Sequence, residues 1–190
     1  MKQLTLLLAP IALVMAGAGH ARADMFNFTF SDPLDGITAS GTLVATPVSG
    51  FQFTATSVIN GMITGNPGGD GTLTLITNPN APAGAATFGD FTYDDFLFPG
   101  GPSPRPIDAD GLMFSVPNGS VINIFVAFGG FPPLYELDDG DNAGHFTFAS
   151  QDVPGFTLTP VANTAPEPSS LCLLGIGAAG LVACRKRKRS

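Results

Sequence analysis

The chain has 190 residues, of which 44% are hydrophobic and only 12% are charged, and its formal net charge is −7. Arg105 is the only lysine or arginine between Asp24 and Cys184, and that stretch holds all fifteen carboxylates, so its formal charge is −14. Such a surface repels phosphate backbones, which excludes nucleic acid as a partner. No cysteine occurs before Cys172, so a hydrophobic core and strand ladders, not disulfides, must stabilise the folded part.

Residues 1–23 predict a secretory signal peptide. Lys2 gives a positively charged start, Leu4 to Ala18 is an uncharged apolar run, and Ala21-Arg22-Ala23 is a small-x-small cleavage site. This order of parts is typical of a signal helix that is removed on export. We therefore expect the mature protein to begin at Asp24.

The segment 24–163 predicts an all-β domain. Phenylalanines alternate with polar residues, as in Phe26, Phe28 and Phe30, so each set of rings shares one face of a strand. Clusters of Gly, Pro, Asn and Asp separate these runs at short intervals, which indicates turns. Ten strands are expected, at 25–30, 37–46, 51–59, 62–64, 72–77, 91–98, 111–116, 120–128, 144–149 and 154–159. Many short strands between such turns favour an antiparallel β-sandwich, and we expect a jelly-roll-like one.

The densest group of carboxylates lies at 136–141, a segment that we expect to be a loop. Asp138, Asp139 and Asp141 are candidate calcium ligands there, because loop carboxylates and carbonyl oxygens form the oxygen cages that calcium takes. Asp108 and Asp110 are an alternative pair, since residues two apart can face the same way. The EF-hand pattern does not occur in the sequence. A solvated acidic loop without any metal is the competing interpretation, and no other cofactor is expected.

No catalytic or cofactor-binding residue is assigned. His145 is the only histidine after the signal peptide, and no G-x-S-x-G sequence accompanies it, so a triad with its nucleophile elbow is not indicated. A glycosidase needs two carboxylates on either side of a cleft, whereas Glu136 and its acidic neighbours lie together on one segment. The absence of tryptophan and the presence of only two tyrosines leave few aromatic platforms for sugars. We therefore predict that the protein is not an enzyme.

The segment 164–190 predicts a sorting signal in three parts. Pro166-Glu167-Pro168 comes first, an apolar span of about 169–184 follows, and the basic run Arg185, Lys186, Arg187, Lys188 and Arg189 ends it. As a helix the span rises about 24 Å, which is shorter than a hydrocarbon core of roughly 30 Å. Long basic side chains that reach the headgroups make up the difference. The positive-inside rule keeps the basic run in the cytoplasm, so we expect it to stop transfer with the domain outside.

This tripartite tail resembles the PEP-CTERM sorting signal of exported bacterial proteins. The resemblance implies processing near Pro-Glu-Pro by exosortase, a membrane-embedded enzyme, in a Gram-negative host that commonly also exports an exopolysaccharide. The stretches 41–65, 91–101, 108–116 and 120–128 resemble, in that order, a recurrent ectodomain that is attached to such tails and has no assigned activity. The resemblance therefore implies export through the inner membrane, transient anchoring by the C-terminus, and a final place at the cell surface or outside the cell.

Two functional hypotheses follow. The first is a non-catalytic structural protein of the surface or extracellular matrix, associated with exopolysaccharide or biofilm and sorted by exosortase. The alternative is a calcium- or polysaccharide-binding extracellular module on the same fold.

Overall fold

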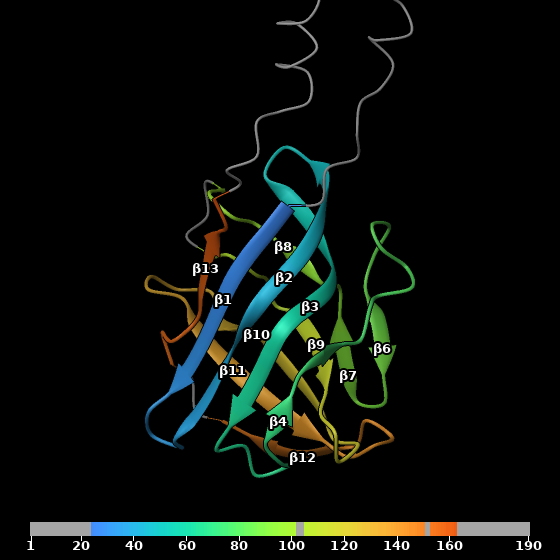
Figure 1. Cartoon of the computed structure of the whole chain (residues 1–190), viewed down its shortest axis with the longest axis vertical. Helices are drawn as coiled ribbons and strands as arrows, with labels where there is room; N and C mark the ends of the chain where they lie inside the picture. The colour runs from blue at the N-terminus through green and yellow to red at the C-terminus, as the bar shows by residue number, and fades with distance from the viewer. Residues whose placement is uncertain (1–23, 102–104, 151–152, 163–190) are drawn as a thin grey trace, which may run out of the picture.

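The computed structural model describes residues 24–101, 105–150 and 153–162, and every regular element within these ranges is a β-strand (Figure 1). The strands are β1 (Asp24–Asp32), β2 (Ile37–Ser49), β3 (Gln52–Thr64), β4 (Gly71–Thr72), β5 (Thr74–Leu75), β6 (Ala86–Phe88), β7 (Phe91–Tyr93), β8 (Phe96–Leu97), β9 (Leu112–Ser115), β10 (Val121–Phe128), β11 (Leu134–Gly140), β12 (Phe146–Ala149) and β13 (Thr157–Pro160). The predicted signal peptide and the predicted sorting signal lie outside the described residues.

Two antiparallel sheets form the body of the domain, which confirms the predicted all-β antiparallel class. The first has the order β13-β1-β2-β3-β4, with β8 also pairing with β3, and the second has the order β12-β11-β10-β9-β5. A separate hairpin, β6–β7, lies to one side (Figure 1). Among the described strands, neighbours within each sheet are mostly consecutive in sequence. This meander differs from the expected jelly roll, in which successive strands alternate between sheets.

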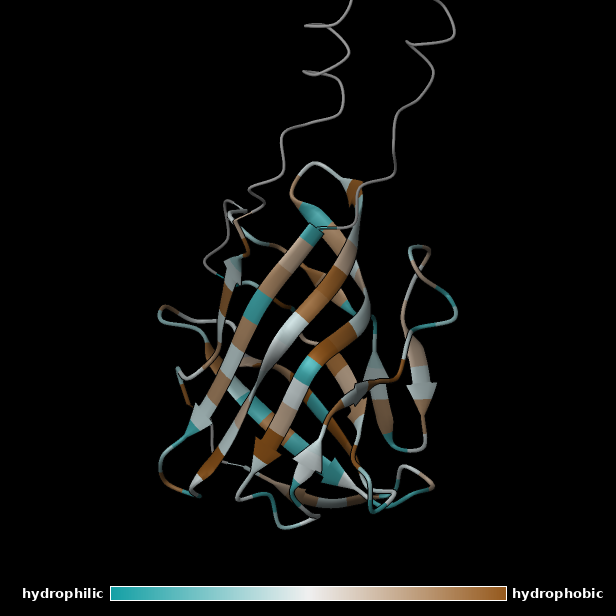
Figure 2. Ribbon diagram, in the orientation of Figure 1, coloured by the Kyte–Doolittle hydropathy of each residue, from teal (hydrophilic) through white to brown (hydrophobic). Residues whose placement is uncertain are grey.

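The main core lies between the two sheets. Phe26, Phe28 and Phe30 of β1 are all at least 97% buried, as their alternation predicts. Figure 2 shows hydrophobic residues interspersed with polar ones along the strands. Phe28 stacks on Phe114 of β9 with ring centroids 5.7 Å apart, so this contact joins the first sheet to the second. The polar residues between them face solvent, where Thr42 donates a hydrogen bond of 2.7 Å to the Oδ1 of Asn27.

A second, smaller core covers the other face of the second sheet. Met113 lies between Leu112 and Phe114, and all three are fully buried. Leu112 and Phe114 face the main core, whereas Met113 packs with Phe91 and Tyr93 of the β6–β7 hairpin. Burial on both faces explains why β9 reads as a continuous apolar run rather than an alternating one.

Several expected elements differ from the structure. The predicted strand 72–77 is two strands, β4 and β5, which belong to different sheets. The predicted strands 51–59 and 62–64 are one strand, β3, which continues past Gly61. The predicted strand 91–98 is broken into β7 and β8 at Asp95, whose φ is 61°. The predicted acidic loop is instead β11, which pairs with β10 and β12. Its inward residues alternate as Tyr135, Leu137 and Asp139, and the aspartate at the third position hid the strand pattern in the sequence.

No helix within the described ranges is long and apolar enough to cross a membrane. The predicted span at about 169–184 lies outside those ranges.

Candidate functional site

The three predicted calcium ligands do not converge. Asp138 and Asp139 are neighbours on β11, so their side chains leave opposite faces of the strand. Asp139 is 2% exposed, and its carboxylate accepts hydrogen bonds from Asn66 at 3.3 Å and from Thr147 at 3.4 Å. Burial raises the pKa of Asp139 above its ordinary value, although both of these hydrogen bonds oppose the increase.

Asp138 forms a pair with Glu136 on the opposite face of β11. The two residues are two positions apart and their carboxyl groups share a hydrogen bond. Burial raises the pKa of Asp138 to about 6, and the bond with Glu136 opposes this increase. The pair therefore holds a proton in mildly acidic solution.

Asp141 follows β11 and fastens the turn that leads into β12. Its Oδ1 accepts hydrogen bonds from the backbone N–H groups of Ala143 at 2.8 Å and His145 at 2.9 Å. These bonds lower the pKa of Asp141. The imidazole of His145 is 68% exposed, with its Nδ1 3.2 Å from the Oδ2 of Asp141. Asp141 thus has a local structural role in which its carboxylate is already occupied.

A more closely associated acidic group lies elsewhere, and we call Asp94, Asp108 and Asp110 the acidic triad. Asp94 is 3% exposed and its Oδ1 accepts a hydrogen bond of 2.9 Å from the N–H of Phe96. The pKa of Asp94 is raised to about 8, chiefly by burial and to a smaller extent by Asp108 and Asp110 as neighbouring negative charges. The pKa of Asp110 is also raised, first by burial and then by Asp108.

Asp95 follows Asp94 in the chain, but its carboxylate bonds to a different segment, at Asn78. Its side chain is fully buried, and its Oδ2 accepts a hydrogen bond of 2.7 Å from the N–H of Asn78. Burial raises the pKa of Asp95 to about 7. The sequence interpretation considered Asp108 with Asp110, but it gave no signal that Asp94 joins them, because the contact depends on packing between distant segments.

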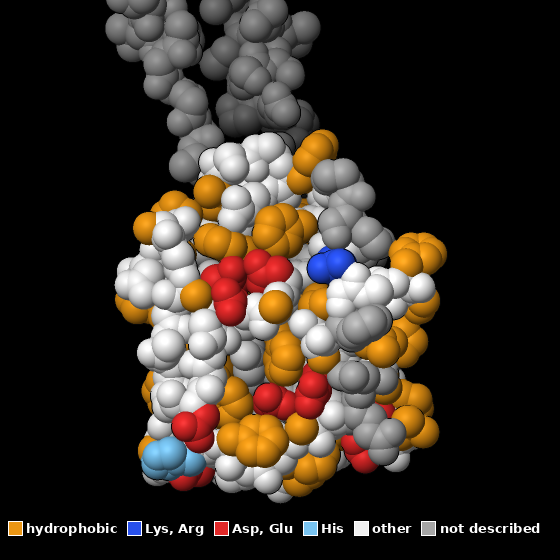
Figure 3. Space-filling model, turned by 180° about the vertical axis from the view of Figure 1, so that it is seen from behind, with side chains coloured by type: hydrophobic (Ala, Val, Ile, Leu, Met, Phe, Trp, Pro, Cys, Tyr) orange, Lys and Arg blue, Asp and Glu red, His pale blue; other side chains and the backbone are white. Residues whose placement is uncertain are grey.

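The arrangement of these carboxylates supports hydrogen bonding within the domain better than metal coordination. Within the described residues, no group of three or more His, Cys, Asp or Glu side chains could hold a metal ion. Figure 3 shows Asp and Glu side chains in separate groups among hydrophobic side chains on one face of the domain. Calcium binding by any other arrangement stays a prediction.

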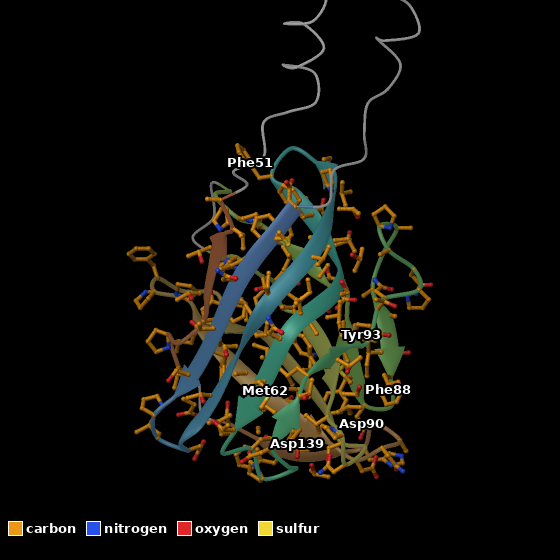
Figure 4. All side chains as sticks on the ribbon, in the orientation of Figure 1. Phe51, Met62, Phe88, Asp90, Tyr93 and Asp139 are labelled. Carbon is orange, nitrogen blue, oxygen red and sulfur yellow. The ribbon has the colours of Figure 1, made fainter. Side chains whose placement is uncertain are left out.

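The other notable feature is the end of the domain where the first and last strands meet, which we call the exit end. Here the N–H of Val161 bonds to the carbonyl of Met25 at 2.8 Å, directly after β13, so the chain enters and leaves the domain side by side. The turn between β2 and β3 projects from the same end, and Figure 4 labels Phe51 at its tip.

Two shallow hollows of about 390 Å³ each flank Phe51. The first is lined by Asp24, Met25, Phe26, Gly50, Phe51, Phe53, Pro99, Pro160 and Val161. The second is lined by Ser49, Phe51, Gln52, Phe98, Gly101, Arg105, Ile107 and Asp108. Phe26 and Phe53 meet edge to face at the first, with ring centroids 5.1 Å apart.

Comparison with known proteins finds one match. Residues 164–188 match the PEP-CTERM protein-sorting motif, which confirms the resemblance of the tail. The motif implies export, transient anchoring of the C-terminus in the membrane, and processing by exosortase, a membrane enzyme. No curated protein and no solved structure matches the chain.

Proposed function

We propose that this carrier of a PEP-CTERM sorting motif is a non-catalytic structural protein of the cell surface or extracellular matrix of a Gram-negative bacterium. The match at residues 164–188 is the observation that carries the proposal. The described domain is a β-sandwich that the tail tethers to the inner membrane until exosortase acts. In this proposal its physiological setting is the exopolysaccharide-containing matrix.

The mechanism is one of transport. The signal peptide at 1–23 starts translocation, and the domain folds outside the inner membrane. The apolar span then enters the bilayer, and the cationic run at 185–189 stops transfer because it remains in the cytoplasm. Pro166-Glu167-Pro168 marks the region at which exosortase separates the domain from its anchor.

The positions of the described residues support separate roles for the folded domain and for the tail. Within the described residues, β1 includes Asp24, the residue that follows the predicted cleavage site, and Val161 still pairs with Met25 of β1. The buried residues of the described core come from both sheets of the domain. Removal of the tail is therefore compatible with a folded product.

The absence of catalysis is supported by what the carboxylates do. Asp141 fastens a turn, Asp95 accepts from Asn78, and Asp139 is held by Asn66 and Thr147. Each of these groups stabilises the domain and is oriented by protein partners, whereas a catalytic acid or base faces a substrate cleft.

Cell fractionation in matched strains with and without exosortase tests the proposal. We expect the protein in the membrane fraction when exosortase is missing and outside the inner membrane when it is present. A chain truncated after Ala162 should leave the membrane in both strains. Equal release of the full chain in both strains would contradict the proposal.

The alternative, a calcium- or polysaccharide-binding module, uses the same exported domain. The observation in its favour is the acidic triad, in which Asp94 shares a hydrogen bond with Asp108 and has Asp110 as a neighbouring negative charge. Binding of calcium to purified domain distinguishes the two proposals, as set out in the Discussion.

A further inference from the structure

We propose that the exit end contacts the headgroup region of the bilayer while the tail is inserted, with Phe51 and Val48 as its apolar contacts. This inference rests on the proposed function, because it requires a membrane-inserted tail. The contact would give the tethered domain a fixed orientation and so present the Pro-Glu-Pro segment in one geometry.

The first argument is the exposure of two apolar side chains at the exit end. Phe51 is 59% exposed and Val48 is 37% exposed, and both lie at the turn between β2 and β3. The hollows on either side of Phe51 extend this apolar surface through Pro99, Pro160 and Val161. Large hydrophobic side chains are also exposed elsewhere, as at Leu34 and Phe131. What distinguishes Phe51 and Val48 is that they lie at the end of the domain from which the tail leaves.

The second argument is the length of chain between the domain and the predicted span. Seven residue steps join Ala162, the last described residue, to Ser169, the start of the span. A fully extended chain reaches at most about 3.5 Å per residue, so the exit end stays within about 25 Å of the membrane surface.

The size of the domain then determines which end can touch the bilayer. A globular domain of this length has a radius of gyration of about 14 Å, and hence a diameter of about 37 Å. Because this diameter exceeds the tether, the end opposite to Phe51 cannot reach the membrane by inversion of the domain. Phe146 lies at that opposite end, since its N–H bonds to Asp90, which Figure 4 labels far from Phe51.

The third argument is charge. Arg105 is the only lysine or arginine among the described residues, and it lies in the hollow beside Phe51, where its guanidinium donates to the carbonyl of Gly129. Asp24 and Asp108 also lie at the rims of the two hollows. The residues around the hollows carry both positive and negative charge, which matches the paired charges of zwitterionic lipid headgroups. An anionic membrane surface would repel a domain with so many carboxylates.

A tryptophan reporter tests the contact, because the native chain has no tryptophan. Full-length Phe51→Trp is reconstituted into phosphatidylcholine vesicles in which part of the lipid carries bromine near the headgroup. The matched control is Phe146→Trp, since Phe146 is similarly exposed at 51%. Bromine should reduce the fluorescence of Phe51→Trp about twofold, as expected for an aromatic ring at the interface, and leave Phe146→Trp unchanged. Val48→Trp is a second reporter, with quenching expected as well.

Flotation of the same vesicles separates failure of this inference from failure of the proposed function. Protein that floats with the vesicles but shows equal quenching at positions 51 and 146 overturns the membrane contact and leaves tail insertion intact. Quenching at position 51 that occurs only when exosortase is in the vesicles also overturns it and assigns the exit end to the enzyme. Protein that does not float at all contradicts the proposed function, and this inference with it.

Discussion

The side chains of Asp94 and Asp108 form a hydrogen bond between two carboxyl groups, one of which must carry a proton. Asp94 reaches this position because the chain leaves β7 there and its N–H pairs with the carbonyl of Gly111 at 3.4 Å. Burial raises the pKa of Asp94 to about 8, so Asp94 is the group that holds the proton at neutral pH. This pair links the stability of the domain to pH.

The stability of the domain should therefore fall as the solution becomes alkaline. Asp94 titrates near pH 4 in the unfolded chain and near pH 8 in the folded domain. Its contribution to the stability of the domain is therefore complete below about pH 4, and it is lost progressively as the pH rises to about 8. The expected slope for one proton is at most about 1.4 kcal/mol per pH unit. Urea denaturation at pH 5, 6, 7 and 8 measures it. The variant Asp94→Asn cannot ionise at this position, so its free energy of unfolding should fall less with rising pH. The control Asp35→Asn, at an exposed position, should keep the slope of the native protein. Equal slopes in the two variants would contradict the role of Asp94 as the proton-holding group.

The contact between the sheets should depend strongly on Phe28. This residue is 1% exposed and stacks on both Phe114 and Phe156, with centroid distances of 5.7 and 6.3 Å. We expect Phe28→Ala to lower the free energy of unfolding by about 3–5 kcal/mol, from lost burial and the cavity left behind. The control Phe131→Ala removes a ring that is 87% exposed and should change stability by less than about 0.5 kcal/mol. Comparable losses in the two variants would mean that the core is not where the structure places it.

Two glycines with nearly equal backbone angles should respond differently to alanine. Gly36 has a φ of 73° with open space around it, whereas Gly65 has a φ of 76° and a Cβ there would lie 2.2 Å from the carbonyl oxygen of Gly36. Gly36→Ala should cost about 1–2 kcal/mol for the left-handed conformation alone. Gly65→Ala should cost about 1–3 kcal/mol more, because the backbone must move to relieve the overlap. Thermal denaturation of both variants measures the difference, and equal melting temperatures would refute the close approach.

Calcium should leave the melting temperature of the domain unchanged at millimolar concentration. The reason is that Asp138 and Asp139 leave opposite faces of β11, and that no group of three or more His, Cys, Asp or Glu side chains among the described residues could hold a metal ion. A thermal shift assay with calcium, and with magnesium as the control ion, measures the effect. A rise in melting temperature that Asp110→Asn abolishes would support the calcium-binding alternative at the acidic triad instead.

The sequence predicted those strands whose side-chain pattern depends only on neighbouring residues. The alternation of Phe26, Phe28 and Phe30 placed β1 with its buried face correctly, because side-chain direction in a strand depends only on position. The strand β11 was missed because Asp139 occupies an inward position, where its burial relies on Asn66 and Thr147 from distant segments. Composition alone makes such a segment resemble an acidic loop.

The acidic triad was beyond prediction for a related reason. Asp94 and Asp95 were expected to lie within one strand, but the left-handed backbone at Asp95 interrupts it. That conformation is held by contacts with Gly111 and Asn78, which belong to other parts of the fold. The sorting motif was predictable, since its parts are contiguous and its match at 164–188 needs no folded context.

The intact mass of the exported protein tests the central claim most directly. Mass spectrometry of material from outside the inner membrane should find a species that begins at Asp24 and lacks Arg185 to Arg189. The same measurement in a strain without exosortase should find those basic residues still attached. An extracellular species that retains Arg185 to Arg189 in the presence of exosortase would contradict the account.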